Sequence, residues 1–62
     1  MTLEEYCKAH RTRPTRGLIK DKNDKIIDFF GVYDLYVFNH DIWDYKVVNY
    51  LRQSKFAIVR RV

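Results

Sequence analysis

The segment that decides the fold is residues 18–30, with the sequence LIKDKNDKIIDFF. Both of its ends are rich in β-branched and aromatic residues, which favour strands. Residues 22–25 lie between these ends and supply asparagine and aspartate, which tolerate the backbone conformations of a tight turn. The segment therefore predicts a β-hairpin.

A short helix is predicted before this hairpin. Thr2 and Glu5 have the spacing of a capping box, in which each side chain bonds the backbone amide of the other residue. Apolar and aromatic positions then fall on one helix face: Leu3, Tyr6, Cys7 and His10. Because two helical turns are marginal alone, we expect this helix to dock on an apolar surface and to end near His10. Residues 11–17 contain a proline and a glycine and predict an exposed loop.

A second hairpin is predicted near the C-terminus, where residues 46–51 and 56–59 are β-rich and residues 52–55 are polar. The alternative is an amphipathic helix, because four apolar residues also have helical spacing: Trp43, Val47, Tyr50 and Leu51. That helix would lack a stop signal and leave other apolar residues off its face, so we favour the hairpin.

Residues 29–38 form the least regular part of the pattern. Eight of these ten residues are apolar and they do not alternate with polar ones. This is typical either of a strand covered on both faces or of a helix that begins after Gly31. Residues 39–44 predict a loop or a single helical turn. The choice between helix and strand therefore stays open for residues 32–51.

The chain has 62 residues, which allows one small domain, residues 1–62, that buries roughly 60% of its unfolded surface. The predicted elements give an α+β fold: a short N-terminal helix packed on a small antiparallel sheet of two β-hairpins. A single cysteine excludes an internal disulfide, so a reducing, cytoplasmic setting is expected. No apolar run approaches the roughly 20 residues that span a bilayer, and residues 1–5 are not typical of a signal peptide. No contact with a membrane is therefore expected.

Three stretches carry a resemblance to known proteins. The chain begins with TLEEY at residues 2–6, has the charged turn KDKNDK at residues 20–25, and closes with DYKVVNY at residues 44–50 followed by FAIV at residues 56–59. In these features it resembles very small accessory proteins encoded by phages and mobile elements of Gram-positive bacteria. The resemblance implies an accessory role in the cytoplasm of a bacterial host cell, in some cases as an inhibitor of a defence or replication enzyme. The basic charge departs from the acidic character of inhibitors that mimic nucleic acid, and no functional residue is carried over.

Neither a catalytic, nor a cofactor, nor a metal site is expected. Cys7 and His10 lie on one helix face, but zinc needs three or four ligands and only His40 and Asp41 remain to complete the set. No carboxylate is placed to orient a Cys–His nucleophile pair. The two glycines do not form a phosphate-cradling loop. We therefore expect a protein that is not an enzyme and has no cofactor.

The aromatic content indicates a partner surface. The chain holds five tyrosines, four phenylalanines and one tryptophan, more large rings than so small a domain is expected to enclose. The leading hypothesis is a non-catalytic interaction protein that forms a homodimer and docks on a larger host enzyme. The expected contact surface is residues 29–38 together with Trp43, and the contact residues singled out are Phe30, Tyr33, Tyr36, Phe38 and Trp43.

The distribution of charge supports a second hypothesis. The formal net charge is +4, and the basic residues are concentrated in residues 11–16 and 52–61. Such clusters, together with aromatic rings, are typical of small nucleic-acid-binding proteins. The residues expected to contact nucleic acid, or an acidic protein surface, are Arg11, Arg13, Arg16, Arg52, Arg60 and Arg61.

Overall fold

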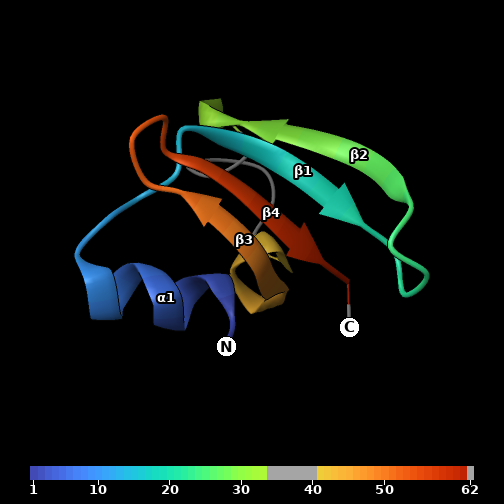
Figure 1. Ribbon diagram of the computed structural model, residues 1–62, viewed down its shortest axis with the longest axis horizontal. Coiled ribbons are helices and arrows are strands. Elements are labelled where there is room, and N and C mark those ends of the chain that lie inside the picture. The colour runs from blue at the N-terminus through green and yellow to red at the C-terminus, as the bar shows by residue number, and fades with distance from the viewer. Residues whose placement is uncertain (34–40, 62) are drawn as a thin grey trace.

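The computed structural model describes residues 1–33 and 41–61 (Figure 1). Its elements follow in the order helix, hairpin, short 3₁₀ helix, hairpin. They are α1 (Leu3–His10), β1 (Arg16–Lys20), β2 (Ile26–Gly31), the 3₁₀ helix η2 (Asp41–Asp44), β3 (Lys46–Leu51) and β4 (Phe56–Arg60). The predicted α+β architecture, with its N-terminal helix and two hairpins, is confirmed.

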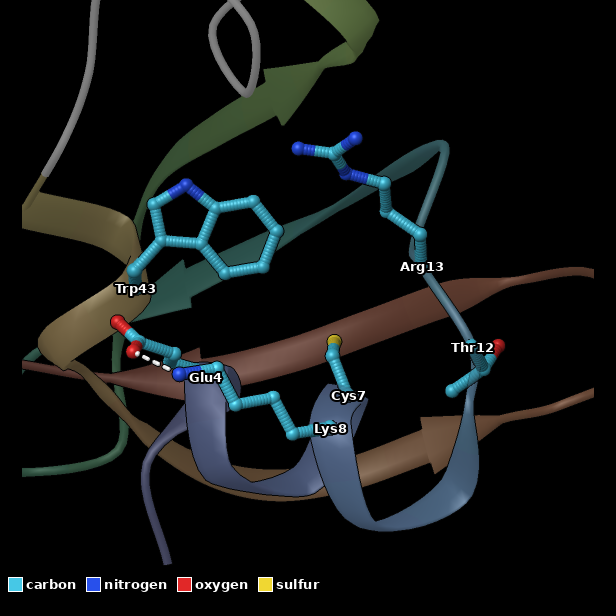
Figure 2. Close-up of a pocket in the computed structure, with 6 residues that line it drawn as sticks. All are labelled: Glu4, Cys7, Lys8, Thr12, Arg13 and Trp43. Atoms are coloured by element: carbon cyan, nitrogen blue, oxygen red, sulfur yellow. Dashed lines mark hydrogen bonds and ion pairs between the residues drawn. The ribbon is translucent and has the colours of Figure 1, made fainter.

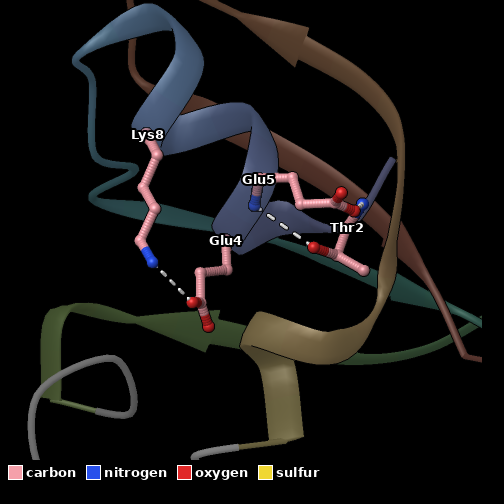
Figure 3. Close-up of polar contacts among 4 residues, drawn as sticks. All are labelled: Thr2, Glu4, Glu5 and Lys8. Carbon is pink, nitrogen blue, oxygen red and sulfur yellow. Dashed lines mark hydrogen bonds and ion pairs between the residues drawn. The ribbon is translucent and has the colours of Figure 1, made fainter.

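Helix α1 begins with the predicted capping box (Figure 3). The Glu5 backbone amide donates to Thr2 Oγ1 at 3.2 Å, and the Thr2 amide donates to Glu5 Oε1 at 2.9 Å. These two bonds satisfy amides that a helix otherwise leaves unpaired at its N-terminus. The helix ends at His10, and Arg11 follows in the left-handed conformation with φ of 51°. Both ends agree with the sequence prediction.

The first hairpin joins β1 to β2 through the predicted polar turn. Asp21 Oδ1 accepts hydrogen bonds from the amides of Asn23 and Lys25 at 2.8 and 3.0 Å. Asp24 takes a positive φ of 65°, which aspartate tolerates better than most residues. The turn is therefore built by the residue types that predicted it.

The second hairpin joins β3 to β4, so the alternative of an amphipathic helix over these residues is wrong. Residues 41–44 form the single turn of 3₁₀ helix that was one of two expectations for this stretch. Residues 34–40 lie outside the described part of the chain, and the choice between helix and strand there stays a prediction.

The sheet is mixed, whereas the sequence predicted an antiparallel one. Its strand order is β2-β1-β4-β3, with β1 and β4 parallel to each other. The physical reason is that the chain leaves the first hairpin at one edge of the sheet and re-enters at the opposite edge (Figure 1). The last strand then meets the first strand in the middle, and both run in the same direction.

Gly17 permits the close approach of these two central strands. A Cβ atom added at Gly17 would overlap the backbone oxygen of Ala57 and the ring of Phe30. The side chain of Phe30 fills the space above the glycine, and only 4% of Phe30 is exposed. Gly17 therefore has a packing role and not a turn role.

The core lies between the sheet and the layer formed by α1 and η2 (Figure 1). Leu3 of α1 and Ile42 of η2 are fully buried against residues of the sheet. The remaining buried apolar side chains come from all four strands: Ile19, Phe30, Tyr50, Ala57 and Val59. No helix in the described part of the chain is long and apolar enough to cross a membrane.

Candidate functional site

The second face of the sheet, away from α1 and η2, is not covered by any described helix. Strand residues alternate between faces, so the neighbours of buried Gly17 and Ile19 in β1 point to this side. We call this side the open face. Its apolar residues, assigned from the strand register, are Leu18, Ile26, Phe29, Leu51, Phe56 and Ile58. Exposed apolar patches often mark interaction sites, so this face is a candidate binding surface.

Two aromatic rings lie on the open face. Phe29 pairs with Leu18, which in turn pairs with Ile58, so the three form one row across the sheet. Phe29 is 70% exposed although it lies within a strand. Phe56 is half-buried, and the guanidinium of Arg16 lies 5.9 Å from the centre of its ring. Strand spacing and rise place the Cα atoms of the two phenylalanines about 12 Å apart.

The charged residues of the open face are all basic. They are Arg16 and Lys20 of β1, Lys46 of β3 and Arg60 of β4. The register assigns no carboxylate to this side of the described strands. Asp24, from the turn before β2, approaches Arg60 at 3.7 Å through exposed side chains, and such a pair contributes little. The open face is therefore apolar at its centre, with Lys20, Arg60 and Lys46 at one end and Arg16 at the other.

A hollow at one end of the open face is lined entirely by cations. It has a volume of about 450 Å³ and is formed by Lys22, Lys46, Arg60 and Arg61. Arg61 Nε donates to the hydroxyl of Tyr45 at 3.2 Å, and this hydrogen bond is the main cause that raises the pKa of the guanidinium. We call this the cationic hollow. Four cations around one space favour an anion such as a phosphate.

A second hollow, of about 370 Å³, lies between α1 and η2 (Figure 2). The indole of Trp43 forms one side, and the Arg13 guanidinium lies 5.5 Å from its ring centre. Lys8 and Glu4, which form an ion pair of 2.9 Å, lie at its rim. The thiol of Cys7 also lines this hollow, and burial raises its pKa. A thiol with a raised pKa is protonated near neutral pH and is a poor nucleophile.

Of the five residues expected at a partner surface, the three that the structure describes do not lie together on one surface. Phe30 lies in the core, because β2 directs its ring onto Gly17 and away from solvent. Trp43 is half-buried and packs against the core, whereas Tyr33 is 78% exposed. Tyr36 and Phe38 lie outside the described residues.

The six arginines expected at an anionic partner are also divided. Arg16 and Arg60 lie on the open face, and Arg61 lies in the cationic hollow beside it. Arg13 lies in the Trp43 hollow, Arg11 follows α1, and Arg52 is exposed in the turn after β3. The structure thus brings the basic clusters of residues 11–16 and 52–61 together only in part.

The sequence prediction did not include Leu18 or the lysines of this surface, and it did not single out Phe29 within residues 29–38. The structure supplies what the sequence lacks, because the burial of Phe30 places Phe29 on the outward side and the register places Leu18 opposite Phe29. Lys46 joins this surface only through the pairing of β3 with β4, for which the linear sequence has no local signal.

Histidine and cysteine do not gather into a metal site in the part of the chain that is described, where no three potential ligands meet. His10, expected on the same helix face as Cys7, packs its ring against Tyr6 with 4.3 Å between ring centres. In this contact the imidazole of His10 packs against an aromatic ring.

Comparison with known proteins gives no relative. No protein-family model matches the chain, and no curated protein or solved structure is significantly similar to it.

Proposed function

We propose that this chain is a non-catalytic nucleic-acid-binding protein whose contact surface is the open face together with the cationic hollow. One observation carries the proposal: the register places four cations and no carboxylate around an apolar, ring-bearing sheet face in the described residues. Lysine and arginine neutralise phosphates and release counterions, which drives binding of nucleic acid. The exposed ring of Phe29 provides a surface on which a base can stack, in addition to the charges that attract the phosphates.

The number of cations sets the expected dependence on salt. Counting one phosphate contact for each of the four open-face cations, and none for Lys22 and Arg61 of the hollow, the slope of log Kobs against log salt concentration is roughly −3 to −4. Affinity then falls roughly 50- to 150-fold between 50 and 200 mM salt. A loss of this size is directly measurable by titration.

The test is fluorescence anisotropy of labelled oligonucleotides, single-stranded and duplex, titrated with the protein at these two salt concentrations. Lys46→Gln removes one cation from the open face, and Lys8→Gln removes one from α1 on the other side of the sheet. We expect Lys46→Gln to weaken binding and to reduce the salt slope by about one unit, and Lys8→Gln to leave both unchanged. No binding of either oligonucleotide at 50 mM salt, or equal effects of the two variants, would contradict the proposal.

The interaction protein expected from the sequence is a second candidate function. It is favoured by a cluster of exposed apolar side chains in residues 26–33: Ile26, Ile27, Phe29, Val32 and Tyr33. Strand β2 lies at the edge of the sheet, so a homodimer or a host enzyme would contact this edge. Two copies stacked through their open faces would instead oppose cation to cation.

Sedimentation velocity tests this second candidate. A homodimer whose mass is halved by Tyr33→Ala would support contact at the β2 edge. A monomer at every accessible concentration, with no change on mixing with a candidate acidic protein, would contradict it.

A further inference from the structure

We infer that the nucleic acid bound by the open face is single-stranded, with an unpaired base stacked on Phe29 and the backbone directed into the cationic hollow. This inference rests on the proposed function and adds the class of partner. It depends on the exposure of one ring, on the shape of the surface and on the position of the hollow.

Among nucleic acids, only one with unpaired bases can stack a base on the ring of Phe29. Its 70% exposure and its place in a strand hold it on the surface beside Leu18 and Ile58. Stacking requires the flat face of a base, and in a duplex both faces of each base are covered by its neighbours. Single strands leave those faces free, and aromatic side chains bind them with little sequence preference.

The shape of the open face is unsuited to a duplex. Most sequence-specific duplex binders insert a helix or a two-stranded ribbon into a groove. The described helices α1 and η2 lie on the core side of the sheet, so neither projects from the open face (Figure 1). A sheet surface touches a rod-like duplex along a narrow line, whereas a flexible strand can follow it from ring to ring.

The cations are placed to follow such a strand. Lys20 pairs with Arg60 across the central strands, two residues along from the row that contains Phe29. Strand spacing puts the Cα atoms of Phe29 and Lys20 about 8 Å apart. Arg60 then leads into the cationic hollow with Lys22, Lys46 and Arg61. The ring of Phe29 and the cationic hollow thus lie along one line, so that a strand whose base stacks on the ring can direct its phosphates toward the cations.

An acidic polypeptide is the competing partner for this surface, and the charges alone do not distinguish it from nucleic acid. Stacking on Phe29 does distinguish them, because a polyglutamate chain has no ring to place there. Substituting leucine retains an apolar side chain but removes the aromatic face. Tyr33 supplies a matched control, since it is a similarly exposed ring outside the strands that form the open face.

The experiment compares labelled oligothymidine, a duplex of equal length and labelled polyglutamate, each titrated with wild type, Phe29→Leu and Tyr33→Leu. We expect oligothymidine to bind more tightly than the duplex. We expect Phe29→Leu to weaken oligothymidine binding at least about five-fold and to leave the duplex unchanged. Tyr33→Leu should change neither. Circular dichroism confirms that both variants fold.

Equal affinity for oligothymidine and duplex, or equal losses from the two leucine variants, would overturn the single-strand inference and leave the proposed function standing. Binding of polyglutamate alone would overturn both and identify an acidic polypeptide as the partner. No binding of any polymer would also overturn both.

Discussion

Because β1 and β4 approach closely at Gly17, we expect one methyl group added at this position to destabilise the fold strongly. In Gly17→Ala the new Cβ would overlap the Ala57 carbonyl oxygen and the Phe30 ring. The oxygen belongs to the neighbouring strand and the ring is buried, so neither moves without cost. Overpacking of this kind costs about 1–3 kcal/mol. In a domain of this size, about 1 kcal/mol lowers the melting temperature by roughly 4–8 °C.

The measurement is thermal unfolding followed by far-ultraviolet circular dichroism. Gly31→Ala is the matched control, because no described atom lies within 4 Å of a Cβ added there and its φ is not positive. We expect Gly17→Ala to melt at least about 4 °C below wild type, and Gly31→Ala to melt at or slightly above it. Equal melting temperatures for the two variants would refute the parallel pairing of β1 with β4 at this position.

Three further predictions concern α1. Thr2→Ala removes the capping bond and should destabilise the fold by about 0.5–2 kcal/mol, measured by urea unfolding, with Ser at this position restoring stability. Hydrogen bonds from Thr2 lower the pKa of Glu5 below its ordinary 4.5, so this carboxylate contributes stability above pH 4.5 that is lost as the pH falls through the lowered value. Unfolding of Glu5→Gln should accordingly depend less steeply on pH in the acid range, and an unchanged slope contradicts this. Burial raises the pKa of Cys7, so a thiol reagent at neutral pH should modify the native protein more slowly than the urea-unfolded chain.

Local chemistry explains which parts of the fold were predictable. The capping box, the polar turn at residues 21–25 and the β-rich C-terminal segments each act over a few residues, and each formed as expected. The parallel pairing of β1 with β4 depends on where the chain crosses the molecule between β2 and η2, and no local pattern specifies that path. The sheet was therefore predicted with its strands correct and its topology wrong.

The candidate site was harder to predict for the same reason. Residues 29–38 lack alternation, so the sequence does not separate an inward ring from an outward one. The structure makes that separation through Gly17, whose missing side chain gives Phe30 room on the core side and leaves Phe29 outside. The cations of the open face come from β1, β3 and β4, and only the sheet pairing brings them together.

The core and the proposed binding surface occupy opposite faces of one sheet, so a substitution that destabilises the core should leave the proposed surface able to bind. The overlap in Gly17→Ala lies on the core side, whereas Phe29 and Lys20 point to the open face. A ligand at 100 times its Kd stabilises the native state by about 2.7 kcal/mol, comparable to the cost of that overlap. Oligothymidine at this excess should therefore raise the melting temperature of Gly17→Ala about as much as that of wild type. Phe29→Leu at the same oligonucleotide concentration should respond less, because its Kd is higher. Equal responses of Phe29→Leu and wild type would place the bound strand somewhere other than the open face.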